Sequence, residues 1–96
     1  MYVLLFANSF PSTYKSLIRG IKEYEKRTNK SLKLLKYNPF YPSLHSHKVK
    51  TRNFGEKWSS WISGDIRIFW DFDRKEKERI NIFAVVSHTG RHREYK

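Results

Sequence analysis

The sequence predicts a small α+β domain, with a two-helix hairpin packed on one face of a four- to five-stranded, mostly antiparallel sheet. Three observations predict this class. The chain has 96 residues, which suits a single domain spanning 1–96. Apolar residues recur every three or four positions in the first half, whereas they alternate with polar residues in the second half. A short apolar run precedes the helical pattern, so the expected order is β-α-α-β-β-β-β.

The N-terminal half is expected to hold one buried strand and the helical hairpin. The strand is expected over 2–7, because the apolar run there is too short for a signal-peptide core or a membrane span. Helical spacing predicts a first helix over 12–29 and a second, shorter one over 31–37. The first helix also carries a basic stripe, which is either a solvated face or a binding surface: Lys15, Arg19, Lys22 and Lys26.

The second half is expected to be sheet. Strands are expected over 45–50, 57–62, 65–73 and 79–87, with a connecting loop over 51–57 and a charged loop, DRKEKE, before the last strand. The last strand is apolar at nearly every position, which is typical of a central strand. Alternation in the third divides its side chains between two faces. Ile66, Ile68, Trp70 and Phe72 are expected under the helices, and Asp65, Arg67, Phe69 and Asp71 on the open face.

The charge indicates the kind of partner. Lys and Arg number twenty against nine Asp and Glu, which gives a formal net charge of +11. Self-repulsion on this scale disfavours folding, so it points to a polyanionic partner, and nucleic acid is favoured over a membrane because no basic amphipathic segment with a wide apolar face is present. The chain has no cysteine, which excludes disulfides and thiolate metal sites and fits a cytoplasmic location.

Several segments, taken in order, resemble the RelE/ParE superfamily of bacterial toxins, in particular its RelE/YafQ-like mRNA-cleaving branch. They are the helical hairpin, the Asn-Pro loop at 38–39, the basic strand HKVK, the segment WISGDIRIFWDF, and the apolar strand that ends in SHTGRHREYK. The resemblance covers essentially the whole chain. It implies the RelE-like microbial ribonuclease fold.

The resemblance also implies an activity and partners. The chain would be the toxin of a type II toxin–antitoxin system that binds the ribosome and cleaves mRNA in the A site, thereby inhibiting translation. The 2′-hydroxyl would attack the adjacent phosphodiester with no metal and no other cofactor. A cognate acidic antitoxin protein would hold the toxin silent, and no membrane is involved.

This reaction needs a base, an acid and cationic groups for the phosphate. Histidine suits the proton transfers because its usual pKa lies near neutral pH, and arginine binds phosphate through two hydrogen bonds. A tyrosine could stack on a base or donate a proton. The residues implied as catalytic are His92, Arg67, Tyr95, Asp65, His47 and Arg91. Those expected to bind RNA or the ribosome are Lys48, Lys50, Arg52, Lys57, His88, Arg93, Lys22 and Lys26.

Two departures from the family pattern leave the assignment of acid and base open. Trp61 stands four residues before Asp65, where the YafQ-like pattern has a histidine. His92 lies three residues before Tyr95 rather than four, and the residue four before is Arg91. Regular alternation would also turn His47 toward the core with Val49, leaving Lys48 and Lys50 outward to face RNA.

Three alternatives stay open at this point. The first is a ParE-like toxin that inhibits DNA gyrase and lacks nuclease activity. The second is a non-catalytic RNA-binding module, in which tryptophan and phenylalanine side chains stack on bases while lysines hold phosphate. The third is a zinc site formed by the four histidines, which we do not favour because Thr89-Gly90 disrupts a helical spacing between the last two.

Overall fold

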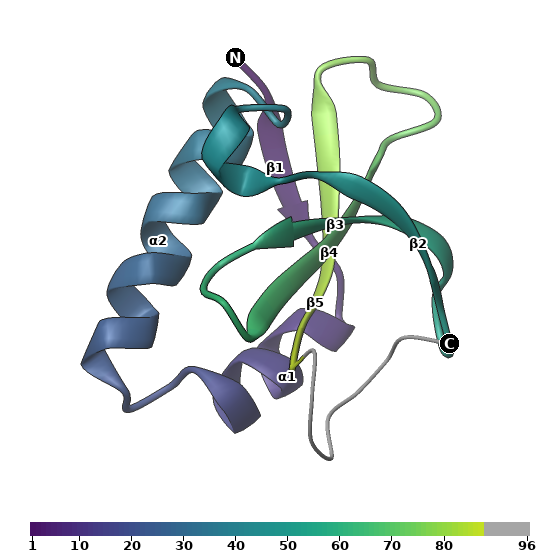
Figure 1. The fold of residues 1–96 in the computed structure, drawn as a ribbon. Helices are drawn as coiled ribbons and strands as arrows, with labels where there is room; N and C mark the ends of the chain where they lie inside the picture. The colour runs from purple at the N-terminus through teal and green to yellow at the C-terminus, as the bar shows by residue number, and fades with distance from the viewer. Residues whose placement is uncertain (88–96) are drawn as a thin grey trace.

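The computed structural model describes residues 1–87, which form two helices and a five-stranded sheet (Figure 1). One turn of 3-10 helix precedes the second strand. The bounds are β1 Val3–Phe6, α1 Ser9–Leu17, α2 Lys22–Tyr37, the 3-10 turn Pro42–Leu44, β2 His47–Thr51, β3 Gly55–Trp61, β4 Ile66–Phe72 and β5 Arg79–Ser87. The predicted α+β class and element order are therefore confirmed.

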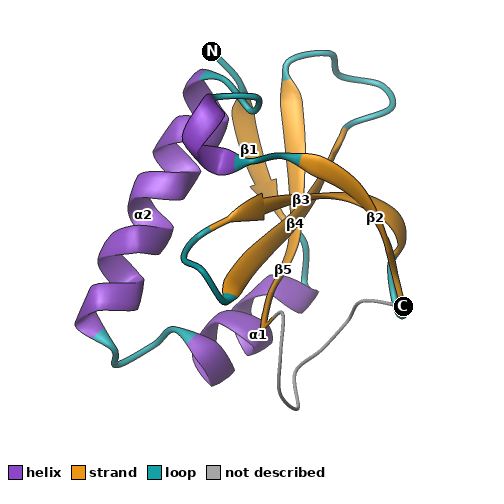
Figure 2. Cartoon of the chain, in the orientation of Figure 1, coloured by secondary structure: helices purple, strands orange, loops and turns teal. Residues whose placement is uncertain are grey.

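The strands lie side by side in the order β1-β5-β4-β3-β2 (Figure 2). Only the pair of β1 and β5 is parallel among these strands, and the other three pairs are antiparallel. The two helices follow β1 along the chain, and the four later strands form the rest of the sheet, so that β1 pairs with the last strand, β5. β5 therefore has a hydrogen-bonded neighbour on each side, as its continuous apolar sequence predicts.

One face of the sheet, which we call the helix face, packs against α1 and α2. Its centre is made of Ile68, Trp70, Ile80 and Ile82, all with no exposed surface. The helices contribute apolar side chains to the same cluster, among them Leu17 from α1 and Leu35 from α2. The predicted inward set of β4 is thus confirmed, and it supplies much of the core.

The opposite side, which we call the open face, carries a second and smaller apolar cluster. Phe69, Ala84 and Val86 are buried there, with Val49 packed against them. The register between β4 and β5 shifts after Phe69, because Phe69 pairs with Ala84 whereas Trp70 pairs with Ile82. The bulge leaves Phe83 as an extra residue on the open face. The backbone oxygen of Phe83 accepts a hydrogen bond of 2.6 Å from the hydroxyl of Ser9, the first residue of α1.

β1 is an edge strand, and the prediction that it is buried is wrong. Val3 and Leu5 are 61% and 50% exposed, and Phe6 is 43% exposed. Only the side chains that alternate with Val3 and Leu5, such as Leu4, pack against the core. An apolar run predicts a strand but does not say whether a second strand or helix covers it.

The break between the helices also differs from the prediction. The sequence suggests a first helix that continues to Asn29, whereas the chain turns at Gly20, which has a φ of +90°. Glycine accepts this left-handed conformation because it has no Cβ. Asn29 lies inside α2, and the predicted basic stripe is split, with Lys15 on α1 and Lys26 on α2.

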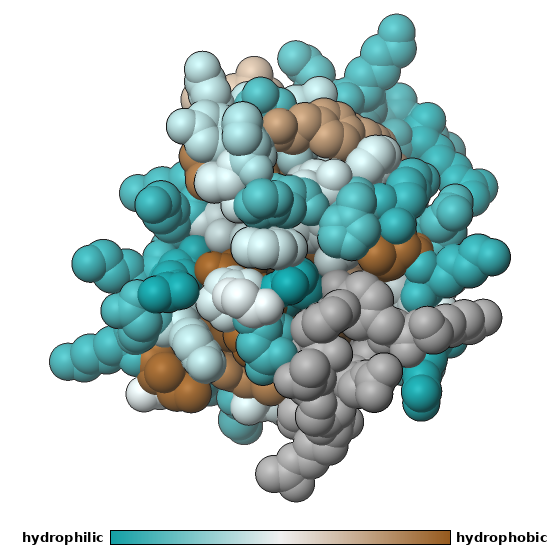
Figure 3. Space-filling view, viewed as in Figure 1, coloured by the Kyte–Doolittle hydropathy of each residue, from teal (hydrophilic) through white to brown (hydrophobic). Residues whose placement is uncertain are grey.

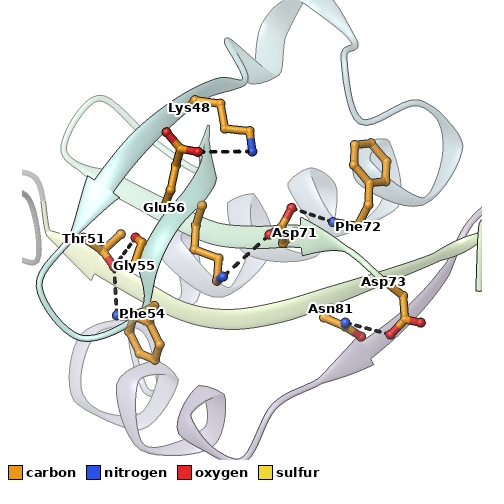
Figure 4. A network of polar contacts seen from close by, with 10 residues as sticks. Lys48, Thr51, Phe54, Gly55, Glu56, Asp71, Phe72, Asp73 and Asn81 are labelled. Carbon is orange, nitrogen blue, oxygen red and sulfur yellow. Dashed lines mark hydrogen bonds and ion pairs between the residues drawn. The ribbon is translucent and has the colours of Figure 1, made fainter. Parts of the chain in front are cut away.

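The strands of the second half begin and end close to their predicted bounds. The expected loop over 51–57 is a tight turn, because the Thr51 hydroxyl accepts from the Phe54 N–H at 2.9 Å and donates to Gly55 O at 2.8 Å (Figure 4). β3 therefore begins at Gly55 rather than Lys57. At the other hairpin, the charged residues 73–78 form the connection as predicted.

The segment before β2 is tied to the core by a chain of hydrogen bonds. Trp70 Nε1 donates to Ser60 Oγ at 2.7 Å, and the hydroxyls of Ser60 and Ser46 are 2.6 Å apart. Ser46 donates its one proton to Pro39 O at 2.6 Å, so the proton between the two serines comes from Ser60. This chain fixes residues 39–46 against β3 and β4.

Hydrophilic residues surround most of the outline of the molecule in the view of Figure 3, with smaller hydrophobic patches between them. This is the surface that a net charge of +11 predicts. Within residues 1–87, no helix combines the length and the apolar character that crossing a membrane requires.

Candidate active site

Arg67 lies on the open face at the middle of the sheet. It stands opposite Trp61 in the register of β3 and β4, and its Cζ is 4.6 Å from the centre of the indole ring. Alternation correctly predicts the face. It does not predict the burial, because Arg67 is only 7% exposed. The indole covers the guanidinium and forms a cation–π contact with it.

The hydrogen bonds of Arg67 leave its charge without a carboxylate. Nη1 donates to the backbone oxygen of Ser63 at 2.7 Å and, at 3.4 Å, to that of Ile66. The ion pairs within residues 1–87 join other residues, and none includes Arg67. A buried cation without a counter-ion is unfavourable, so this position suits an anion that arrives from outside the described residues.

Asp65 lies just before β4, beside the end of β5. The Ser87 hydroxyl donates to Asp65 Oδ2 at 3.1 Å, and Ser87 pairs with Ile66 in the sheet. β5 therefore ends beside Ile66, between Asp65 and Arg67. The residues predicted beyond this point lie outside the described residues and stay predictions: His88, Arg91, His92, Arg93 and Tyr95.

His47 is the first residue of β2 and is exposed on the open face. It shares a side with Val49, as expected, and Val49 packs in the open-face cluster, but His47 itself is exposed rather than turned into the core. The pairing explains the outcome, since His47 stands opposite Ser59, which stands opposite Phe69. His47 Nδ1 lies 2.9 Å from the backbone oxygen of His45.

The same pairing reverses the prediction for Lys48 and Lys50. Both alternate with His47 and Val49, so they extend on the side of the helices rather than on the open face. Lys48 Nζ lies 5.3 Å from the ring centre of Trp58, a residue that packs against the helix-face core, and 3.9 Å from Glu56 Oε1 (Figure 4). These two lysines are therefore exposed cations on the other side of the sheet from Arg67.

Lys57 is the predicted RNA-binding lysine that does lie on the open face. Its Nζ is 3.6 Å from Asp71 Oδ2 and 4.9 Å from the ring centre of Phe83. The carboxylate partly neutralises it, so it adds less to a phosphate site than Arg67 does. Arg52 is exposed at the turn between β2 and β3.

Trp61 and His45 lie beside Arg67 and His47. The sequence offers Trp61 only as a base-stacking residue of the non-catalytic RNA-binding alternative, and it does not predict His45 as catalytic or RNA-binding. The His45 ring lies 4.1 Å from the Trp61 ring, at an interplanar angle of 34°. Trp61 is 36% exposed, so part of the indole stays accessible. The signal available in the sequence is the pattern His45-x-His47, which predicts two histidines near each other but not their contacts.

A groove of about 530 Å³ runs beside this cluster, between α2 and the turn that joins β3 to β4. Lys26, Arg27 and Lys30 of α2 line it, and Trp61 forms part of its wall. Arg27 donates to Glu23 Oε2 at 2.8 Å, and this bond lowers the pKa of the Glu23 carboxyl. Lys26 is thus one predicted cation that lines the same groove as Trp61, whereas Lys22 begins α2 outside the groove lining.

Within the part of the chain that the structure describes, no group of three or more histidine, aspartate or glutamate side chains is arranged to hold a metal ion. The chemistry that the cluster offers is that of Arg67, His47, His45 and Asp65, with Trp61 as an aromatic surface. These groups suit a phosphodiester with an adjacent base.

Comparison with known proteins shows the fold. No family model and no curated protein matches the sequence. Solved structures do match. A YoeB/ParE toxin from Agrobacterium tumefaciens has a TM-score of 0.71 and 18% identity, over 93% of this chain and 100% of that one.

Two further structures agree. YafQ from E. coli strain BL21(DE3) has a TM-score of 0.68 and 10% identity, over 91% of this chain and 93% of that one. A heterotetrameric YoeB-YefM toxin-antitoxin complex from Staphylococcus aureus has a TM-score of 0.67 and 21% identity, over 93% of this chain and 99% of that one. The chain therefore has the fold of the RelE/ParE toxins, and the predicted resemblance is confirmed at the level of the fold.

Proposed function

We propose that this chain is the toxin of a type II toxin–antitoxin pair and that it inhibits translation in the cytoplasm by cleaving ribosome-bound mRNA. The observation that carries the proposal is Arg67, a guanidinium 7% exposed with no carboxylate partner within residues 1–87. The fold that the chain shares with YafQ and with YoeB supports it. A phosphate is the anion that a polycationic protein of this size most readily recruits.

The reaction proceeds at a single phosphodiester. The O2′–P bond forms as a base accepts the 2′-hydroxyl proton, and the P–O5′ bond breaks as an acid donates a proton to the leaving oxygen. The products are a 2′,3′-cyclic phosphate and a 5′-hydroxyl, so atoms and charge balance with neither metal nor water. Arg67 stabilises the negative charge that grows on the phosphoryl oxygens.

The proton transfers are assigned to histidines. His47 is the base in this proposal, because it is exposed on the same face as Arg67. His92 is the acid, since the chain leaves β5 beside Asp65 and His92 follows five residues after Ser87. Tyr95 and Arg91 complete the site as proposed from the sequence, with Tyr95 stacking on a base.

Nucleic acid would extend from this centre along the basic groove. Lys26 and Lys30 line the groove, and Trp61 connects it to Arg67. Exposed aromatic rings stack on unpaired bases, while lysines hold the backbone through charge alone. The mRNA and the ribosome are thus the proposed polyanionic partners.

The antitoxin would bind elsewhere, at the apolar edge formed by β1 and α1. Val3, Leu5 and Phe6 are exposed there, and Phe6 lies 4.8 Å from Phe10 between ring centres. A hollow of about 570 Å³ next to Phe10 is lined by Lys15 and Arg19. An acidic segment with apolar side chains would match this combination of apolar and cationic surface.

The test is translation in vitro followed by primer extension on the mRNA. Wild type should produce cuts at defined codon positions, and Arg67→Ala and His92→Ala should each reduce the cleavage rate by about 10²–10³-fold, the loss expected for a group that stabilises the transition state. Arg74→Ala removes the same charge from an exposed loop and is the matched control, which should cleave like wild type.

Other results would contradict the proposal. If both site variants cleave mRNA at the wild-type rate, neither Arg67 nor His92 takes part in the reaction. Arrest of DNA supercoiling without mRNA cuts would indicate a gyrase inhibitor. RNA binding with neither effect would indicate a non-catalytic RNA-binding module.

A further inference from the structure

His45 has an unusual backbone conformation. Its φ of +48° and ψ of +44° lie in the left-handed region, and it is the one residue other than glycine with positive φ within residues 1–87. L-residues are disfavoured there because Cβ approaches the following carbonyl, so surrounding structure has to hold the residue in place. Residues held in this way cluster at functional sites.

Two contacts hold residue 45. Its N–H donates to Pro42 O at 3.2 Å and closes the 3-10 turn. The next residue, Ser46, is held by the hydrogen-bond chain that begins at Trp70 Nε1 and ends at Pro39 O. The buried Trp70 of the helix face therefore anchors Ser46, the residue between His45 and the start of β2.

The first consequence concerns the tautomer of His47. The left-handed turn directs the His45 carbonyl toward His47, whose Nδ1 lies 2.9 Å away. A carbonyl oxygen only accepts, so Nδ1 carries the proton of the neutral ring and Nε2 keeps a lone pair. Nε2 is then the proton acceptor, and the ring orientation is fixed.

The second consequence concerns Trp61. The His45 ring contacts the indole at 4.1 Å, and the Arg67 guanidinium contacts it at 4.6 Å. β3, which carries Trp61, lies between β2 and β4; the contact of Arg67 comes from β4, and that of His45 comes from the segment that leads into β2. His45 thereby limits how far the indole can rotate away from Arg67.

We propose that His45 is a positioning residue of the RNA-cleaving site, with its carbonyl setting the tautomer of His47 and its ring holding Trp61 over Arg67. This inference rests on the proposed function. In the reaction, the proton of the 2′-hydroxyl moves to His47 Nε2 as the O2′–P bond forms. A separate acid protonates O5′ as the P–O5′ bond breaks.

Three substitutions separate the backbone from the ring. His45→Gly keeps the left-handed conformation and removes the ring, because glycine has no Cβ. His45→Asn also tolerates this conformation and keeps a short polar side chain. His45→Val disfavours the conformation, since a β-branched residue rarely adopts positive φ. Circular dichroism establishes that each variant is folded.

The first measurement is the ¹⁵N NMR spectrum of His47, which reports the tautomer directly and needs no nuclease activity. Wild type, His45→Gly and His45→Asn should show a proton on Nδ1, and His45→Val should show a mixture. An Nε2-protonated ring in wild type, or loss of the Nδ1 proton in His45→Gly, would overturn the role of the carbonyl whether or not His45→Val folds.

The second measurement is the single-turnover rate of mRNA cleavage on the ribosome. His45→Val should be slower than wild type by up to about 100-fold, the loss that misplacing a catalytic group by about 1 Å can cause. His45→Gly should lose a smaller factor, due to the ring alone. If wild type cleaves and His45→Val is equally fast, the positioning role of His45 is refuted while the proposed function stands. If wild type does not cleave, the proposed function fails, and the inference fails with it.

Discussion

The two faces of the sheet are built from alternate residues of the same strands, yet they differ in almost every physical property. On the helix face, Ile68, Trp70 and Ile82 are fully buried among apolar side chains. On the open face, the equally buried Phe69 lies two residues from Arg67, a cation with no ion pair inside the described residues. Both faces are therefore buried at β4, but the helix face buries apolar side chains alone, whereas the open face also buries a charged one.

This difference teaches that one strand can serve stability and chemistry at once. β4 lies at the centre of the sheet with a hydrogen-bonded strand on each side, and its backbone holds Arg67 beside Trp61. A site on a strand held by a packed core keeps its geometry better than a site on a loop. The substitutions below test whether the two faces are as separable as this arrangement suggests.

The largest effect on stability is expected at Ile68. Ile68→Ala should lower the free energy of unfolding by about 2–5 kcal/mol, because it removes buried methylene groups and leaves a cavity. Its neighbour Arg67→Ala should cost much less, since the lost contacts are offset by removal of a buried charge that has no ion pair among residues 1–87. Urea denaturation of both variants measures the difference. Equal destabilisation would mean that the two faces form one energetic unit.

A smaller effect is expected at Ser60, which lies on the helix face and joins Trp70 to the segment before β2. Ser60→Ala should cost about 1–3 kcal/mol, because the buried Trp70 Nε1–H loses its acceptor. Ser43→Ala, at an exposed serine of the same region, is the control and should change stability little. Thermal unfolding gives both values. If Ser60→Ala is as stable as wild type, the hydrogen-bond chain does not anchor residues 39–46.

The smallest effect is expected at Asp73, beyond both clusters (Figure 4). The Asn81 amide, the backbone N–H groups of Glu76 and Lys75, and Arg79 hold the pKa of this carboxyl well below its usual value of 3.8. The folded state therefore binds fewer protons than the unfolded state, so the stability that Asp73 contributes is complete above about pH 4 and is lost as the pH falls.

Asp73→Asn has no carboxylate to protonate at this position, so its stability should not show the part of the acid-induced loss that Asp73 causes. The unfolding temperature of wild type should fall more between pH 6 and pH 3 than that of the variant. Glu78→Gln, in the same loop, has no such bonds among its described contacts and should leave the wild-type slope unchanged. Identical slopes for wild type and Asp73→Asn would contradict the assignment.

Part of the site could be predicted from the sequence. Alternation along IRIFWDF places Arg67 opposite the helix-covered set, and the structure agrees. The same rule correctly puts His47 on the side of Val49, but it does not say which face of the sheet that side is, because this depends on which residue of the neighbouring strand each one pairs with. The β2 register against β3 puts His47 opposite Ser59, so the histidine is on the open face and Lys48 is not.

The amino-acid pattern was enough to predict the class of the fold, the element order, the positive surface and the buried face of β4. These follow from periodicity and composition, which act through neighbours along the chain. Only the tertiary structure decided that Trp61 covers Arg67, that β1 is an exposed edge, and that His45 turns its carbonyl to His47. Each depends on strand order, register or a single backbone angle, and these are set by contacts between residues far apart in the sequence.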